Sequence, residues 1–169
     1  MTAERTLLLN PSAIRHKLER MAYEILEHNF SEKEIILAGI NVKGLALAKA
    51  LAAILKAVGD AEINVVPVSV LPENPLKEDV EVDDPKVAHG KVVIICDDVA
   101  NTGRTILYAM KPFLNVLPKK VQVAVLVDRK HKRFPISADY VGMSLSTTLQ
   151  EHIEVELKGN EFRGAYLED

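Results

Sequence analysis

The segment Val92–Thr105 limits the possible folds of this chain more than any other part of the sequence. It starts with the apolar run Val92–Cys96, continues with the acidic pair Asp97 and Asp98, and ends in the turn Thr102–Thr105, which has the sequence Thr-Gly-Arg-Thr. A short run that is apolar at every position is typical of a strand buried on both faces, as in parallel sheets. The sequence therefore predicts a buried strand whose carboxyl end leads through a glycine turn into a helix.

The remaining sequence alternates between strand and helix patterns. The apolar spacing and the cap residues predict helices at Asn10–Asn29, Leu45–Val58 and Arg104–Leu117, the last interrupted near Pro112. Predicted strands cover Glu34–Ile40, Glu62–Val70, Lys91–Cys96, Val121–Val127 and the alternating residues of Ile153–Leu157. Pro67 indicates that its strand lies at a sheet edge or contains a bulge. We predict an α/β fold with a mainly parallel twisted sheet and flanking helices.

Length and composition narrow the class of protein. The 169 residues favour a single domain covering residues 1–169, and a net charge of −3 argues against a general nucleic-acid binder. The one cysteine, Cys96, lies in an apolar run, so we expect a buried and inert thiol and a reducing compartment. We also expect no signal peptide, no membrane partner and a cytoplasmic location, because the chain has neither a secretory leader pattern nor a long apolar stretch.

Three predicted loops follow strands and lie at one edge of the sheet. They are Asn41–Gly44, Asp97–Arg104 and Asp128–Arg133, and each contains charged residues or glycine. Ligands of open α/β sheets bind beyond the carboxyl ends of the strands. We therefore expect the binding site to be built from these three loops.

The central loop has the chemistry of a phosphate site. The start of a helix offers unpaired backbone N–H groups, and Gly103 allows an anion to approach the backbone closely. The hydroxyls of Thr102 and Thr105 and the charge of Arg104 add further donors. Carboxylates beside such a site would repel phosphate, so they suit ribose hydroxyls or a Mg²⁺ ion instead.

These residues resemble the type I phosphoribosyltransferases, whose motif joins an apolar strand, two acidic residues and a Thr-Gly-(Arg/Lys)-Thr loop. The resemblance implies a small hood formed by the terminal segments and catalytic roles for Asp97 and Asp98, which would also hold Mg²⁺, in part indirectly. It further implies that phosphoribosyl pyrophosphate (PRPP) binds through its 5′-phosphate to Ala100, Asn101, Thr102, Gly103, Arg104 and Thr105. The pyrophosphate loop of the family aligns with Asn41, Val42, Lys43 and Gly44, where Lys43 replaces the usual arginine.

A second resemblance points to one branch of this family. The segment Leu126–Ile136, with the sequence LVDRKHKRFPI, and the following Ala138–Gly142 are similar to the bifunctional pyrimidine-operon attenuators and uracil phosphoribosyltransferases, the PyrR-type proteins. This implies transfer of phosphoribosyl from PRPP to a pyrimidine base, uracil, with Asp128 and Arg129 near the base. It also implies binding of a nucleobase or a nucleoside monophosphate and assembly as a homodimer.

Departures from the family pattern keep two alternatives open. Asn101 replaces the aspartate usual in hypoxanthine-guanine enzymes, and the expected flexible loop Leu71–Gly90 contains no arginine. The chain could therefore be a catalytically weak nucleotide-sensing or RNA-binding regulator, or a phosphoribosyltransferase for another base. The basic clusters Arg15–Arg20 and Arg129–Arg133 could meet RNA phosphates, but Glu19 lies inside the first, so we expect any RNA binding to be weak and electrostatic.

Overall fold

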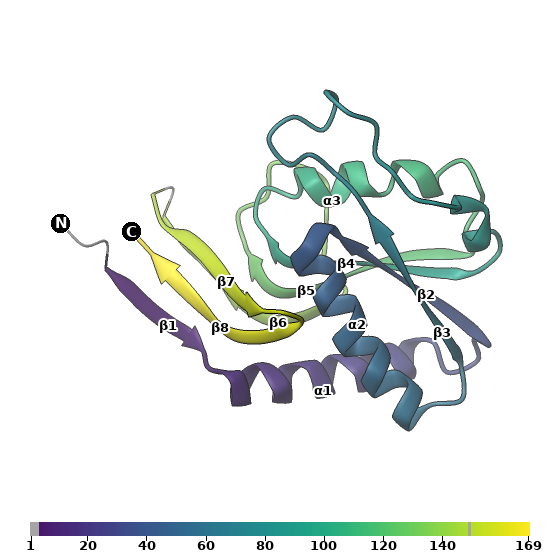
Figure 1. Cartoon of the computed structure of the whole chain (residues 1–169), viewed down its shortest axis with the longest axis horizontal. Coiled ribbons are helices and arrows are strands. Elements are labelled where there is room, and N and C mark those ends of the chain that lie inside the picture. The colour runs from purple at the N-terminus through teal and green to yellow at the C-terminus, as the bar shows by residue number, and fades with distance from the viewer. Residues whose placement is uncertain (1–3, 149) are drawn as a thin grey trace.

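The computed structural model describes residues 4–148 and 150–169, and its main feature is a five-stranded parallel sheet (Figure 1). The strand order is β3-β2-β4-β5-β6, with every neighbouring pair parallel. The strands are β2 (Glu34–Ile40), β3 (Glu62–Val68), β4 (Val92–Ala100), β5 (Lys120–Arg129) and β6 (Tyr140–Leu145). The predicted α/β class with a mainly parallel sheet is confirmed.

Helices cover both faces of this sheet, so each face has its own apolar core. The helices α1 (Pro11–His28) and α2 (Asn41–Val58) pack on one face, against side chains such as Ile35 and Ile94. The short α3 (Arg104–Ala109) and two single 3-10 turns, Pro85–Ala88 and Lys111–Phe113, lie over the other face. Successive residues of β4 alternate between the two cores, which explains why Val92–Cys96 is apolar throughout.

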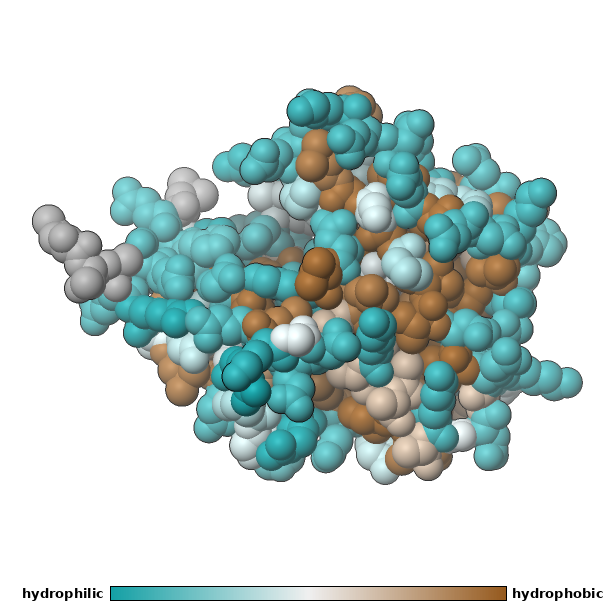
Figure 2. All heavy atoms as spheres, in the orientation of Figure 1, coloured by the Kyte–Doolittle hydropathy of each residue, from teal (hydrophilic) through white to brown (hydrophobic). Residues whose placement is uncertain are grey.

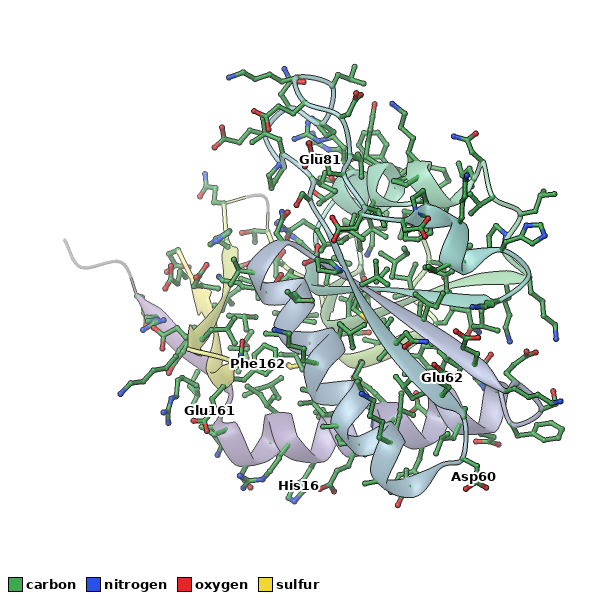
Figure 3. All side chains as sticks on the ribbon, turned by 45° about the vertical axis from the view of Figure 1, so that its right-hand side comes forward. His16, Asp60, Glu62, Glu81, Glu161 and Phe162 are labelled. Carbon is green, nitrogen blue, oxygen red and sulfur yellow. The ribbon has the colours of Figure 1, made fainter. Side chains whose placement is uncertain are left out.

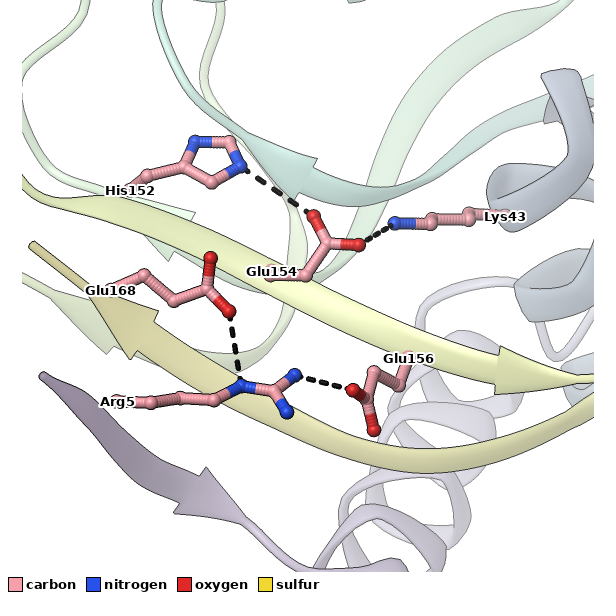
Figure 4. A network of polar contacts seen from close by, with 6 residues as sticks. All are labelled: Arg5, Lys43, His152, Glu154, Glu156 and Glu168. Atoms are coloured by element: carbon pink, nitrogen blue, oxygen red, sulfur yellow. Dashed lines mark hydrogen bonds and ion pairs between the residues drawn. The ribbon is translucent and has the colours of Figure 1, made fainter. Parts of the chain in front are cut away.

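The terminal segments form the predicted hood as a separate antiparallel sheet. Its order is β1-β8-β7, with β1 (Arg5–Leu9), β7 (His152–Lys158) and β8 (Glu161–Glu168). Arg5 links the strands, because its guanidinium contacts Glu156 at 2.5 Å and Glu168 at 3.0 Å (Figure 4). The inner residues Ile153 and Val155 join the core beneath α1 and α2, so the hood rests on the same face as these helices.

The predicted boundaries of α1 and the position of β3 are confirmed. The Asn10 side chain accepts a hydrogen bond from the Ala13 backbone N–H at 2.8 Å and caps α1, and Asn29 ends it. Strand β3 lies at the edge of the sheet, where Pro67 removes no hydrogen bond from a central ladder. Cys96 is fully buried, and burial together with the charge of Asp97 raises the pKa of its thiol far above the ordinary value.

Three segments differ from the prediction. Helix α2 starts at Asn41 directly after β2, with no intervening loop, because Asn41 turns the chain in the left-handed region at a φ of 52°. Strands β4 and β5 run on to Ala100 and Arg129, so the predicted loops after them are shorter. The helix after Gly103 ends at Ala109 and gives way to a 3-10 turn at Pro112.

The segment Leu71–Gly90 is more ordered than a simple loop. Ser69 and Glu81 form a small antiparallel bridge with N–H···O distances of 3.0 and 3.1 Å, which closes the part in between. Ala88 is buried in the core beside α3, so the second half of the segment is packed against the body of the protein. The segment is therefore anchored at Glu81 and Ala88, and residues 71–80 form the part closed off by the bridge.

Within residues 4–148 and 150–169, no helix combines the length and the apolar composition needed to cross a bilayer. Hydrophilic side chains dominate the visible surface, with an apolar area over α2 and β3 (Figure 2). Figure 3 shows the side chains around these elements, with Glu62 at the amino end of β3 and Glu81 below the tip of the Leu71–Gly90 segment, where it bridges Ser69. In α2, Val42 and Val58 are exposed at 74% and 43%.

Candidate active site

The acidic pair lies near the carboxyl end of strand β4 and faces a cavity of about 370 Å³. The cavity is formed by the first turn of α2, the end of β4, the start of α3 and strand β7 of the hood. Its lining residues are Ile40, Asn41, Val42, Lys43, Pro72, Asp97, Asp98, Val99, Asn101, Thr105, His152, Ile153 and Glu154. The cavity thus brings together two of the three predicted loops, Asn41–Gly44 and Asp97–Arg104. Residues of the hood form another wall of the cavity.

The two neighbouring carboxylates do not ionise independently. The pKa of Asp97 is raised well above its ordinary value, chiefly because the surrounding protein excludes water and also because the Asp98 charge is close. The Asp98 backbone N–H, which donates to Asp97 Oδ1 at 2.9 Å, and the Lys43 ammonium act in the opposite direction but do not overcome these effects. A cation or a hydrogen-bond donor placed at this pair would therefore be bound favourably.

The turn Thr102–Thr105 forms a second, smaller hollow of about 50 Å³ beside the first. Gly103 has a φ of 88°, and a Cβ atom on it would lie 3.1 Å from the Cβ of Ile136. The Thr102 carbonyl accepts hydrogen bonds from the backbone N–H groups of Arg133 and Phe134, each at 3.0 Å. The turn is thus held from behind by the segment after β5, while its residues and Asp97 line the hollow.

Arg104 does not point into this hollow as a free charge. Its guanidinium donates to the carbonyl oxygens of Pro72 at 2.6 Å and Glu73 at 3.4 Å. It therefore connects the glycine turn to the beginning of the Leu71–Gly90 segment. The sequence did not reveal this contact, because it joins residues that are about thirty positions apart and depends on the path of an irregular segment.

The predicted pyrophosphate loop forms the first turn of α2. The Asn41 side chain is paired at both ends with the Val70 backbone, donating to its carbonyl at 2.9 Å and accepting from its N–H at 3.0 Å. Gly44 lies against β4, since a Cβ atom there would be only 2.4 Å from the Cys96 carbonyl oxygen. This close contact places Lys43 at the wall of the cavity.

Residues Asp128 and Arg129 are less closely associated with the cavities. Asp128 pairs with Ala100 in the β4–β5 ladder, but its carboxylate is hydrogen-bonded to the Lys132 ammonium. The Arg129 guanidinium donates to the Thr148 carbonyl. Neither residue lines the two hollows around Asp97.

The structure adds two residues that the sequence analysis missed, His152 and Glu154 of β7 (Figure 4). Glu154 Oε1 accepts from Lys43 Nζ at 2.7 Å, and Glu154 Oε2 lies 3.5 Å from His152 Nε2. The pKa of Glu154 is lowered, first because of the hydrogen bond from Lys43. The burial of Ile153 and Val155 places these polar residues on one face of the strand, but only the docking of the hood shows that this face meets the cavity.

A metal site made of protein groups alone is not present in the described parts of the chain. Among residues 4–148 and 150–169, no cluster of three or more His, Cys, Asp or Glu side chains is arranged to hold a metal ion. The Asp97–Asp98 pair supplies the carboxylate oxygens that Mg²⁺ prefers, and Mg²⁺ commonly takes its remaining ligands from water and from substrate phosphates. The donor set therefore fits a magnesium ion that arrives with a phosphorylated ligand.

The chain matches a family model and has relatives with similar sequences. The family model described as "Phosphoribosyl transferase domain" matches residues 6–158. "Bifunctional protein PyrR" of Pelotomaculum thermopropionicum is 36% identical over 169 residues, covering 94% of this chain and 92% of the relative. The protein of the same name from Alkaliphilus metalliredigens is 39% identical over 166 residues, covering 91% and 89%.

Solved structures with a similar fold have low sequence identity. The hypoxanthine phosphoribosyltransferase of Trypanosoma cruzi has a TM-score of 0.78 at 17% identity, covering 96% of this chain and 95% of that one. A hypoxanthine-guanine phosphoribosyltransferase of Bacillus anthracis has a TM-score of 0.69 at 19% identity, covering 86% and 84%. These similarities concern the fold, in agreement with the parallel sheet and its flanking helices.

Proposed function

The chain belongs to the type I phosphoribosyltransferase family, and we propose that it transfers the phosphoribosyl group of PRPP to a pyrimidine base, uracil, giving UMP and pyrophosphate. One observation carries the proposal: the acidic pair, the glycine turn and Lys43 surround adjoining hollows at the carboxyl edge of the sheet. A ribose phosphate that also bears pyrophosphate needs these three kinds of group at once.

Each group has a role that follows from its chemistry. As the bond from the ribose anomeric carbon to pyrophosphate breaks, positive charge develops on the ribose, and the carboxylates of Asp97 and Asp98 stabilise it while accepting hydrogen bonds from the ribose hydroxyls. The backbone N–H groups of residues 100–105 and the threonine hydroxyls hold the 5′-phosphate. The first turn of α2, residues 41–44, binds the leaving pyrophosphate through Lys43. A ring nitrogen of the base then bonds to the anomeric carbon and loses its proton to the departing pyrophosphate or to water.

We propose Mg²⁺ as the cofactor because of the charge balance in the cavity. Among the described residues, three carboxylates, those of Asp97, Asp98 and Glu154, line the cavity together with one ammonium, that of Lys43. A bound magnesium ion, held by Asp97 and Asp98 directly or through water, would neutralise charge on the pyrophosphate. Without it, a polyphosphate would enter a cavity with net negative charge.

The choice of a pyrimidine rests on the relatives and on one position in the site. The relatives at 36% and 39% identity are named for the PyrR function. Asn101 lines both hollows, and its amide cannot remove a proton from a purine as an aspartate could. Asp128 and Arg129 lie at the end of β5 next to Ala100, and we propose that they approach the base when it is bound.

A second candidate, a regulator that binds nucleotide or RNA, is favoured by the missing arginine in Leu71–Gly90. The contacts of two basic residues argue against an RNA-binding regulator. Arg20 donates to the carbonyls of Val141 and Gly142 at 2.9 and 2.8 Å, and Lys132 is bound to Asp128, so these charges are already used within the protein. We therefore place catalysis ahead of RNA binding.

We further propose that residues 1–169 act as one domain, in the cytoplasm, and as a homodimer. The exposed Val58 and the apolar area visible over α2 and β3 support self-association, because large exposed apolar areas often mark interfaces. The single buried cysteine is consistent with a reducing compartment. Sedimentation showing only monomer at micromolar concentration would refute the dimer.

The test of the reaction is PRPP-dependent turnover of a panel of bases, measured as pyrophosphate release. We expect uracil to be the preferred base, with magnesium required, and we expect the double variant Asp97→Asn, Asp98→Asn to lose turnover and most PRPP binding. Preference for hypoxanthine or guanine would replace the proposed base. PRPP binding without turnover of any base would favour the regulator, and equal PRPP binding by the double variant would disprove the role of the acidic pair.

A further inference from the structure

The ion pair between Lys43 and Glu154 lies where the proposed reaction would release pyrophosphate. Lys43 Nζ lies 2.7 Å from Glu154 Oε1, so the first turn of α2 is bound to strand β7 of the hood (Figure 4). Both side chains line the same cavity as Asp97 and Asp98. The pair is thus part of the cavity wall and not an isolated contact on the surface.

Several anionic groups in this cavity can pair with the ammonium of Lys43. Among the described residues that line it, Lys43 is the one lysine or arginine, and it faces the three carboxylates of Asp97, Asp98 and Glu154. His152, the remaining basic residue of the lining, lies beside the second oxygen of Glu154. An incoming polyphosphate therefore meets an ammonium group that already has an anionic partner.

The Glu154 carboxylate and a phosphoryl group of pyrophosphate can each serve as the anionic partner of Lys43. A carboxylate oxygen and a phosphoryl oxygen both accept strong charge-assisted hydrogen bonds from an ammonium group. The ammonium of lysine is a compact charge on a flexible stem, so it can move from one acceptor to another without the fixed geometry of an arginine fork. About a third of each side chain, 36% for Lys43 and 37% for Glu154, is exposed, so neither partner is locked in place by packing.

We propose that Glu154 is a positioning residue that competes with pyrophosphate for Lys43. This inference rests on the proposed phosphoribosyl transfer and deepens it. In the empty site Glu154 holds the ammonium of Lys43 at the cavity wall. When pyrophosphate is bound, Lys43 exchanges partners, and the lost ion pair with Glu154 offsets part of the binding free energy, which limits how tightly the product is retained.

The competition predicts that replacing Glu154 increases the affinity for pyrophosphate, whereas damage to the structure would decrease it. Glutamine has the shape of glutamate but no charge, so Glu154→Gln removes the competing anion and leaves a hydrogen-bond acceptor for Lys43. Inorganic pyrophosphate should then bind about three- to five-fold more tightly than to the unchanged protein, the size expected for a partly exposed ion pair. A residue that only supported the hood would weaken binding when it was replaced.

The experiment is a calorimetric titration with inorganic pyrophosphate in the presence of magnesium at low ionic strength. The matched control is Glu156→Gln, which removes the same charge from the same strand but leaves the cavity intact, because Glu156 pairs with Arg5 instead. We expect the control to bind like the unchanged protein, within about two-fold. In a Lys43→Met background, Glu154→Gln should lose most of its effect, since no ammonium remains to compete for.

Several results would overturn the proposal. These are unchanged or weaker pyrophosphate binding by Glu154→Gln, an equal gain in Glu156→Gln, or a gain that persists fully in Lys43→Met. Glu154→Thr, a good strand residue, gives the same expectation should the glutamine variant fail to fold. If the unchanged protein neither binds pyrophosphate nor turns over PRPP, the proposed function fails; if it does both while Glu154→Gln has no effect, the competition alone is wrong.

Discussion

Replacing Gly44 by alanine tests whether close packing between α2 and β4 sets the geometry of the site. The new Cβ atom would lie 2.4 Å from the Cys96 carbonyl oxygen and 3.2 Å from the Cβ of Ile40. The first of these is a backbone atom in the central strand, so no side-chain rotation can relieve the contact. The helix must move away from the strand by roughly an ångström, the difference from an ordinary C···O contact.

The expected loss of stability combines two opposing terms. Alanine is favoured over glycine inside a helix by about 1 kcal/mol, whereas overpacking of this kind costs about 1–3 kcal/mol, occasionally more. We therefore expect a net destabilisation of at most about 2 kcal/mol, or a fall in melting temperature of up to roughly 8 °C for a chain of this size. Urea and thermal unfolding would measure this change.

The effect on turnover is the sharper measurement, because Lys43 and Asp97 sit on the two elements that separate. A misplacement of about 1 Å can cost on the order of 100-fold in rate, so we expect the pyrophosphate-release rate to fall about 10- to 100-fold. Gly159→Ala is the control: Gly159 has a φ of 62° and open space around its Cβ position in the β7–β8 turn. It should lose stability through strain and keep its turnover. Equal turnover in the two variants would refute the reasoning.

Three further results are expected. Arg104→Lys loses the guanidinium contact with the start of the Leu71–Gly90 segment, so hydrogen exchange there should become faster, and unchanged protection would contradict this role. Because the folded-state pKa of Glu154 is depressed, its pair with Lys43 stabilises the protein above the ordinary carboxyl pKa of 4.5, and this contribution is lost as the pH falls through the folded value. Urea unfolding should therefore show Glu154→Gln to be less stable than the unchanged protein at pH 7, by at most about 1 kcal/mol, and this difference should shrink as the pH is lowered below 4.5; a constant difference would argue against the pair. A pyrimidine-operon leader hairpin should bind at micromolar strength and be released by about 0.2 M salt in a gel-shift titration, whereas nanomolar binding that strengthens with UMP would promote the regulator.

The parts of the fold that depend on local chemistry could be predicted from the sequence. The Asn10 cap and Pro11 defined the start of α1, and the apolar run at the start of β4 predicted a strand buried on both faces. Pro67 indicated an edge strand, which its place in the sheet confirms. In each case neighbouring residues supply the physical cause, so no knowledge of distant contacts was needed.

The parts that depend on distant contacts could not be predicted in the same way. The start of α2 was placed too late, because the left-handed turn at Asn41 is stabilised by its hydrogen bonds to Val70, 29 residues away. The strand β1 escaped notice because its burial depends on β8 at the far end of the chain. For the same reason Glu154 was missing from the predicted site, although Asp97 and Lys43 were included and do line one cavity.

The pairing of β1 with β8 also sets an order for folding during synthesis. Arg5 lies opposite Glu168 in this ladder, so β1 has no partner until the residues of β8 have left the ribosome. The five-stranded sheet ends at Leu145 and can assemble earlier, because all of its strand pairings are made by residues that precede β7. A nascent chain would therefore carry the acidic pair and the glycine turn on a formed sheet while the wall that contains Glu154 is still missing. The binding cavity can therefore close only after β7 has been synthesised and has docked against the formed sheet.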